Sequence, residues 1–208
     1  MIYLSGHVRD GLEKISPLLG YIYTPITGYR HIPRVAWAGD NGCFSHPELF
    51  SWDRYADWLE ARSGYRSECL FVTARDAVAD AATTLLLSEP MLPELRALGY
   101  RAALVFQDGL ERMTIPWNSF DAAFIGGSTA WKLGPAWELS AEAKARGKWV
   151  HVGRVNSWRR LRACQTAGVD SVDGTLLRFG PDINTVHLKR WLKMIRIQPS
   201  FDLFGGAK

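Results

Sequence analysis

Short apolar runs recur along the chain and alternate with longer segments in which apolar residues have helical spacing. Runs that are apolar throughout are typical of strands in a parallel sheet, which is covered on both faces. We therefore expect strands at residues 1–4, 35–38, 69–72, 102–106, 122–125 and 149–152, and a seventh within residues 167–175. Residues 10–34 contain three prolines and Gly28, which predicts a loop with at most a short helix.

Helical spacing and stop signals place helices between these strands. Ser51 is a predicted N-cap, and Gly147 and Gly168 are predicted stops. We expect helices over residues 52–62, 79–98 (broken near Pro90 and Pro93), 136–146, 157–166 and 185–197.

Strands that alternate with helices predict a compact α/β fold, a (β/α)8 barrel of the TIM type. A chain of 208 residues is short for eight full repeats, so we expect reduced or irregular first units. The whole chain, residues 1–208, is predicted to form one domain, with 198–208 as a flexible tail. No Gly-x-Gly-x-x-Gly or Walker sequence follows any strand, which disfavours dinucleotide and P-loop sites.

Composition narrows the class of protein only slightly. The chain is 47% hydrophobic and 22% charged, with a net charge of +4, which permits an anionic partner such as nucleic acid. Its three cysteines are widely separated, so we expect a reducing compartment and no bound metal or other cofactor. The amino terminus lacks the features of a signal peptide and no apolar run is long enough to cross a bilayer, which predicts a cytoplasmic protein.

Polar residues and glycines follow the predicted strands, and in this architecture such positions meet at one rim. They are Asp40, Asp76 with Asp80, Gln107, Gly126 with Gly127, Gly153 with Arg154, and Asp173. Two carboxylates on different strands, Asp40 and Asp173, suit substitution at a sugar anomeric carbon with retention. Gln107 offers a donor and an acceptor to a purine-like base, and backbone amides at Gly126 and Gly127 can approach a planar ligand.

Each candidate also has a purely structural interpretation. Asp173 could cap the next turn, and Gly-Asp-Asn-Gly around Asp40 is a plain turn sequence. Asp80 could sit in the first turn of its helix. His151 on an apolar strand is predicted to be a hydrogen-bonded core residue, and Cys43 a small packed one. Asp170 points to the opposite face from Asp173, so we expect a structural role for it.

Arginines gather in one region of the chain. Arg154, Arg159, Arg160 and Arg162 surround Trp158, which suits contacts to nucleic-acid phosphates. The alternative is a solvated basic face of a helix.

The order of these motifs resembles the tRNA-guanine transglycosylase superfamily, and within it the short deazapurine-transferase relatives associated with DNA modification in phages and bacteria. Residues 40–45 (DNGCFS) resemble the family's Asp-Ser-Gly-Gly-Phe-Gln, and residues 168–173 (GVDSVD) its Gly-Val-Asp-x-Phe-Asp. Gln107 resembles its base-recognising glutamine, residues 124–128 its Gly-Gly-Leu segment, and residues 151–154 its late glycine strand. The matches span residues 35–175.

The resemblance implies an enzyme in which Asp173 attacks C1′ and displaces guanine, leaving a covalent glycosyl-enzyme. Asp40 would be the general acid/base, and Asp80, Gln107 and the Gly127 amide would bind the guanine or 7-deazaguanine-type base. Asp76 is an equally near candidate for the place of Asp80.

The chain also departs from the family. It lacks the zinc-binding cysteines and the insertion around them, and Gly174-Thr175-Leu176 replaces the family's Pro-Thr-Arg. These departures favour DNA over tRNA as the substrate. The alternatives are an N-glycoside hydrolase acting on a nucleoside or nucleotide, and a non-catalytic barrel that binds nucleic acid. A more remote one is an enzyme for a small phosphorylated sugar held by the loops at Gly153 and Gly174.

Overall fold

The computed structural model describes residues 1–6, 11, 14–27 and 35–197. Eight parallel strands form a closed barrel in chain order, with β8 pairing with β1. The strands are β1 (Ile2–Ser5), β2 (Leu19–Tyr23), β3 (Trp37–Gly39), β4 (Cys69–Thr73), β5 (Ala102–Phe106), β6 (Ala122–Ile125), β7 (Trp149–Val152) and β8 (Ser171–Gly174). The predicted (β/α)8 barrel is therefore confirmed.

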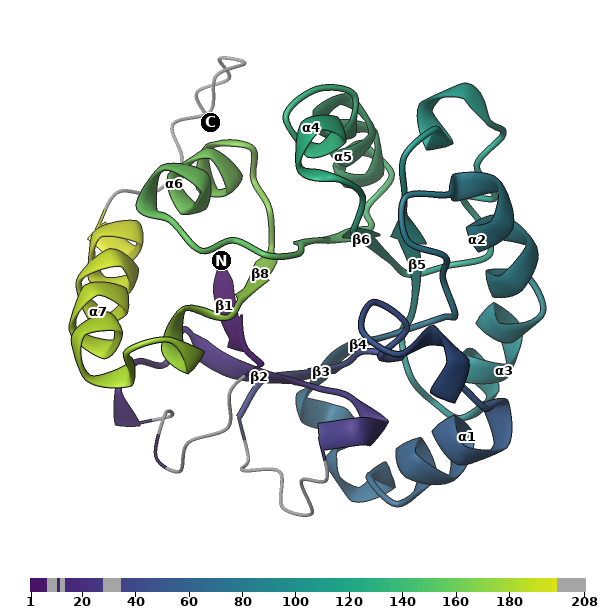
Figure 1. The fold of residues 1–208 in the computed structure, drawn as a ribbon, viewed down its shortest axis with the longest axis horizontal. Coiled ribbons are helices and arrows are strands. Elements are labelled where there is room, and N and C mark those ends of the chain that lie inside the picture. The colour runs from purple at the N-terminus through teal and green to yellow at the C-terminus, as the bar shows by residue number, and fades with distance from the viewer. Residues whose placement is uncertain (7–10, 12–13, 28–34, 198–208) are drawn as a thin grey trace.

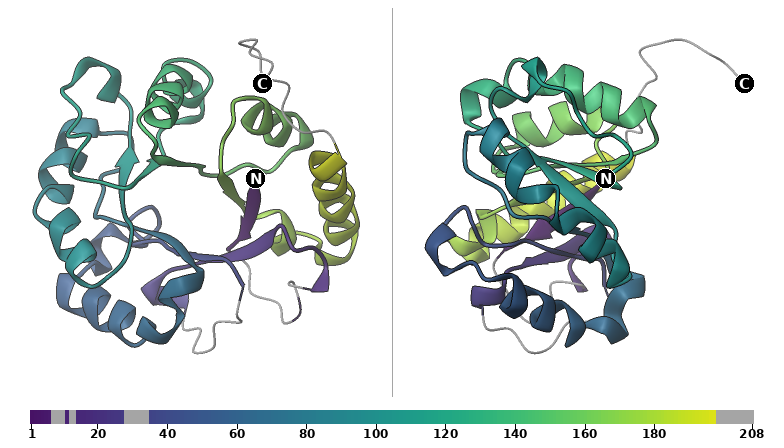
Figure 2. Two further views of the ribbon diagram at one scale, coloured as in Figure 1. Left: turned by 180° about the vertical axis from the view of Figure 1, so that it is seen from behind. Right: turned by 90° about the vertical axis from the view of Figure 1, so that its right-hand side faces the viewer.

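Helices surround the barrel as an outer ring, which Figure 1 shows along the barrel axis and Figure 2 from behind and from the side. They are α1 (Trp52–Glu60), α2 (Ala81–Ser88), α3 (Met91–Ala97), α4 (Thr129–Lys132), α5 (Ala136–Ala145), α6 (Trp158–Thr166) and α7 (Pro181–Ile197). Among the described residues between β1 and β3 there is no α-helix, in agreement with the irregular first units expected. The predicted tail, 198–208, lies outside the described residues.

The expectation of a loop over residues 10–34 was wrong, because β2 lies there. Its five residues are all buried, and it pairs with both β1 and β3. Gly20, which reads as a loop signal in the sequence, is required by close packing. A Cβ at this position would lie 2.2 Å from the backbone oxygen of Ala36. The glycine thus belongs to a strand rather than to a turn.

The interior of the barrel is apolar on one side and polar on the other. Strands β1 to β6 contribute an apolar cluster that includes Leu4, Phe71 and Phe124. On β7 and β8 the alternate positions carry Trp149, His151, Ser171 and Asp173, with His151 paired to Ser171 in the strand register. A second, larger apolar cluster fills the space between the strands and the helices. The buried polar side chains of β7 and β8 therefore lead to Asp173.

Candidate active site at the barrel rim

A cavity of about 660 Å³ opens at the carboxyl-terminal ends of the strands, and we call it the rim cavity. Every strand contributes at least one lining residue, located within three residues of its carboxyl-terminal end. In strand order these are Gly6, Thr24, Asp40, Asp76, Gln107, Gly126, Gly153 and Asp173. The expectation that the strand-end residues share one rim is therefore met by all eight strands.

Asp173 faces the cavity with both carboxylate oxygens held. His151 Nε2 lies 3.0 Å from Oδ2, and the backbone N–H of Arg154 donates to Oδ1 at 3.2 Å. The side chain of Asp173 is 16% exposed, whereas that of His151 is fully buried. Asp173 therefore has a fixed orientation and remains accessible from the cavity.

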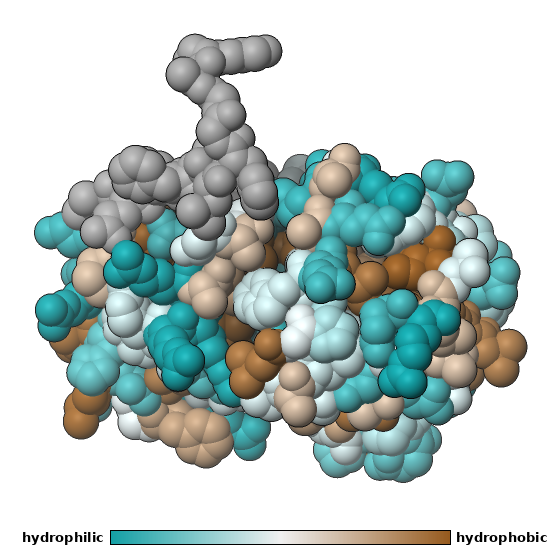
Figure 3. All heavy atoms as spheres, turned by 90° about the horizontal axis from the view of Figure 1, so that it is seen from above, coloured by the Kyte–Doolittle hydropathy of each residue, from teal (hydrophilic) through white to brown (hydrophobic). Residues whose placement is uncertain are grey.

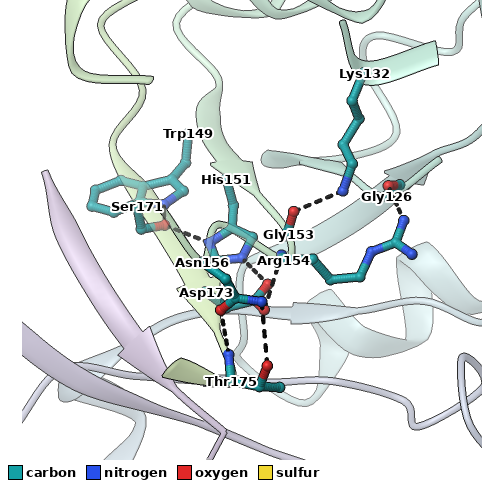
Figure 4. Close-up of polar contacts among 10 residues, drawn as sticks. All are labelled: Gly126, Lys132, Trp149, His151, Gly153, Arg154, Asn156, Ser171, Asp173 and Thr175. Carbon is teal, nitrogen blue, oxygen red and sulfur yellow. Dashed lines mark hydrogen bonds and ion pairs between the residues drawn. The ribbon is translucent and has the colours of Figure 1, made fainter. Parts of the chain in front are cut away.

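A chain of hydrogen bonds extends from Asp173 into the barrel (Figure 4). The hydroxyl of Ser171 lies 2.9 Å from His151 Nδ1, and Trp149 Nε1 donates to the same hydroxyl at 2.9 Å. When Ser171 donates to Nδ1, the neutral imidazole carries its proton on Nε2 and donates it to Asp173. His151 is a buried, hydrogen-bonded residue as predicted, but its contact with Asp173 was missed. Its alternation with Trp149, matching that of Ser171 and Asp173, could have revealed it.

Glycines allow the backbone to pass close to Asp173. A Cβ at Gly153 would lie 3.2 Å from Asp173 Oδ2, and one at Gly174 would lie 2.2 Å from the Tyr3 hydroxyl oxygen. The loop after β7 is fastened to the end of β8, because Val155 N–H donates to the Asp173 carbonyl and Thr175 N–H donates to Asn156 Oδ1.

Asp40 supplies a second carboxyl group with a different environment. It is half-buried in the wall of the rim cavity and accepts a hydrogen bond from Gly42 N–H at 2.7 Å. Burial raises its pKa from the usual 3.8 to about 7, and the negative charges of Asp76 and Asp173 act in the same direction. Near neutral pH Asp40 can therefore give up or take up a proton.

Asp76, not Asp80, is the carboxylate of the β4–α2 loop that faces the cavity. Asp76 is 8% exposed, and accepts hydrogen bonds from Asn41 Nδ2 at 2.9 Å and Gln107 Nε2 at 2.6 Å. Burial outweighs these bonds and raises the pKa of Asp76. Asp80 is exposed, is not among the residues that line the rim cavity, and caps α2 by accepting from Thr83 N–H. Its helix-cap alternative is confirmed.

Gln107 is buried and locked in place. Its Oε1 accepts from the N–H groups of Ala79 and Gly127, and its Nε2 donates to Asp76. One Nε2 hydrogen is left for a ligand. The Gly127 N–H, which was expected to contact a base, donates to Gln107 within the protein. Gly127 instead lies where a Cβ would be 2.3 Å from the Trp131 ring.

Arg154 has a largely internal role. Its φ of 61° is left-handed, which is uncommon for a residue with a side chain. The guanidinium donates to the carbonyls of Gly126 and Gly127 and lies over the Phe44 ring, 4.8 Å from its centre. Arg154 lines the rim cavity, but this guanidinium braces the loop after β6 rather than projecting freely toward a phosphate.

The other three arginines of the predicted basic cluster do not line the rim cavity. Arg159 and Arg160 line a separate cavity beside α6, while Arg162 is exposed on the same helix and lines neither cavity. Two structural expectations hold: Asp170 accepts from Lys144 Nζ at 2.7 Å, and Cys43 is buried, with burial raising its pKa to about 11.

No protein-family model matches the chain, and a search of curated proteins found no match. Among the described residues no helix is long and apolar enough to span a membrane, and no group of three or more His, Cys, Asp or Glu side chains is placed to hold a metal ion.

Proposed function

We propose that this chain is a base-exchange glycosyltransferase that replaces a guanine in nucleic acid with a 7-deazaguanine-type base, with DNA as the favoured substrate. One observation carries the proposal: Asp173, held by two N–H donors, and Asp40, whose pKa is raised to about 7, line the same cavity. A fixed carboxylate and a carboxyl group that titrates near neutrality form the pair that double displacement requires.

In the proposed reaction an Asp173 oxygen attacks C1′ of the target nucleotide. The bond between C1′ and the base nitrogen breaks, and its electron pair leaves with the base. Protonated Asp40 gives its proton to the leaving base, and a covalent glycosyl-aspartate remains. The deprotonated Asp40 then accepts a proton from the incoming base, whose nitrogen attacks C1′ and releases Asp173.

Asp76 and Gln107 are suited to recognise the base. The carboxylate of Asp76 uses one lone pair on each oxygen within the protein, and further lone pairs can accept from the N–H groups on the edge of guanine. The remaining Nε2 hydrogen of Gln107 can donate to a carbonyl oxygen such as O6. The resemblance to the transglycosylase superfamily assigns base recognition to the same region.

The decisive experiment incubates the protein with guanine-containing DNA, RNA and nucleosides and measures released guanine and uptake of labelled guanine. We expect release and uptake with wild type, and a loss of about 1000-fold or more in Asp173→Asn, because the amide cannot form the intermediate. Asp80→Asn is the matched control, since asparagine also caps a helix and Asp80 lies outside the cavity.

The outcomes separate this proposal from its alternatives. Release without uptake indicates the hydrolase, in which water replaces the incoming base. Binding of nucleic acid without release, unchanged in Asp173→Asn, indicates the non-catalytic barrel and contradicts the proposal. Mass spectrometry of protein quenched in acid should detect a sugar adduct on Asp173 in wild type alone.

A further inference from the structure

A second cavity, of about 380 Å³, lies between α4, α5 and α6, and we call it the helix cavity. Its apolar walls include Ile125, Trp137 and Val152. Figure 3 views the molecule from the side that carries these three helices, where hydrophilic and hydrophobic residues are interspersed. The helix cavity adjoins the rim cavity, because Gly153 and Arg154 line both.

The charged side chains that line the helix cavity are positive. Its lining includes Lys132, Arg154, Arg159 and Arg160, and none of the described residues that line it is an aspartate or glutamate. The carboxylate whose charge acts on Lys132 is Asp173, which lines the rim cavity and not the helix cavity. The helix cavity therefore combines several cations with no carboxylate of its own.

Lys132 is the most informative of these cations. Its side chain is buried, with the residue 9% exposed, and its ammonium donates to the Gly153 carbonyl at 2.7 Å (Figure 4). An ammonium has three N–H donors, so this bond satisfies only one of them. Burial and the charges of Arg154 and Arg160 lower the pKa of Lys132 to about 8. An anion in the cavity would supply the missing acceptors and relieve the repulsion.

We propose that the helix cavity is a phosphate-binding site, with Lys132 at its base and Arg160 and Arg159 at its mouth. The proposed function is needed only to say which molecule carries the phosphate. That molecule would be the nucleic-acid strand whose target base enters the rim cavity. The shared wall at Gly153 and Arg154 places a phosphate next to the cavity in which the nucleoside reacts. The structure thus assigns two of the three helix arginines, and not Arg162, to phosphate contact.

The test is a calorimetric titration at low salt with inorganic phosphate, guanosine 5′-monophosphate, a guanine-containing dinucleotide and guanosine. We expect wild type to bind each phosphate-bearing ligand, and the monophosphate more tightly than guanosine. Arg160→Gln should weaken phosphate binding about fivefold or more through the loss of a charge-assisted contact. Arg162→Gln, which removes the same charge from an exposed position on the same helix, should change it less than twofold.

Lys132→Met tests the base of the site, since methionine keeps the length of the buried side chain. We expect phosphate affinity to fall at least tenfold while the far-UV circular dichroism spectrum stays that of wild type, which shows that the variant is folded. If Lys132→Met loses more affinity for the dinucleotide, the site binds a phosphodiester of a strand. If it loses more affinity for the monophosphate, the site binds a free nucleotide. No phosphate binding by wild type, or equal losses in Arg160→Gln and Arg162→Gln, would overturn the proposal.

This outcome is independent of the proposed reaction. Phosphate affinity is measured without turnover, and guanine release from nucleosides needs no phosphate site. Failure of one experiment therefore leaves the other able to succeed.

Discussion

At the scale of single residues, the site depends on how Asp40 and Asp173 are placed rather than on their identity. Asp173 projects into the rim cavity with an N–H donor on each oxygen, while Asp40 shares that cavity with two other carboxylates. Burial raises the pKa of Asp40 most, and the neighbouring negative charges of Asp76 and Asp173 add to this effect. The same residue type therefore has two roles.

The raised pKa of Asp40 predicts a pH dependence. Its folded-state pKa of about 7 lies above the usual 3.8, so the folded protein binds the proton more tightly than the unfolded chain. The stability contributed by the protonated form is complete below about pH 4 and is lost as the pH rises through 7. Asp40→Asn resembles the neutral acid, and should be more stable than wild type at pH 8, by roughly 1–4 kcal/mol, but not at pH 4.

Urea denaturation at the two pH values measures this difference, and the activity of Asp40→Asn provides a second readout. Guanine release by wild type should decline above pH 7, as Asp40 loses the proton that the leaving base needs. An equal effect of the substitution on stability at pH 4 and pH 8 would contradict the raised pKa.

His151 is predicted to position Asp173. His151→Phe keeps an aromatic ring against Phe71 and Phe124, whose ring centres lie 5.0 and 4.5 Å away, but removes the donor to Asp173. We expect kcat to fall by about 10- to 100-fold with KM nearly unchanged, because a carboxylate that is free to rotate is seldom in the attacking geometry. Steady-state kinetics measure this split.

His151→Gln, which carries an amide donor, should recover part of the loss. If His151→Phe and His151→Gln lose activity equally while both remain folded, the hydrogen bond is not what positions Asp173.

At the scale of elements, apolar runs with one clear period were predictable and a strand rich in glycine and tyrosine was not. β5, β6 and β7 coincide with the predicted ranges, since each is a short apolar run between polar segments. β2 was missed because the three prolines and Gly28 read as loop signals, and because nothing in the local sequence shows that Gly20 packs closely against Ala36. For His151, alternation along β7 and β8 indicates the strand face that it shares with Asp173, and the pairing of the two strands makes them neighbours.

The close approach of β2 and β3 predicts the effect of Gly20→Ala. The added Cβ would lie 2.2 Å from the Ala36 carbonyl oxygen and 2.9 Å from Leu4 Cδ2, so the strands must separate. We expect a loss of about 3 kcal/mol or more in the free energy of unfolding, measured by urea denaturation. Gly64→Ala is the control, since a Cβ there meets no atom within 4 Å, and its stability should change by less than about 1 kcal/mol. Equal effects of the two substitutions would contradict the packing seen at β2.

At the scale of the whole molecule, the closed barrel brings residues from both halves of the chain to one cavity. Asp40 and Asp173 are far apart in sequence, and they line the same space because the strands close in chain order. The neighbouring helix cavity adds positive charge next to this rim. Under the two proposals, one barrel with a net charge of +4 would place a reacting centre beside a phosphate contact.

The recessed position of Asp173 predicts which form of DNA reacts. Asp173 is only 16% exposed, so C1′ of a stacked and paired nucleotide cannot reach its carboxylate. The target must be single-stranded or flipped out, and extrusion from a duplex costs a few kcal/mol. We expect guanine release from a single-stranded oligonucleotide to exceed release from the same sequence in a duplex by about 100-fold. A duplex with a mismatch opposite the target guanine should give an intermediate rate, because an unpaired base costs less to extrude.

Single-turnover measurements with the three oligonucleotides at one salt concentration provide the comparison. Equal rates on paired and single-stranded DNA would show that the nucleotide is not extruded, and that C1′ is attacked while the base remains in the stack.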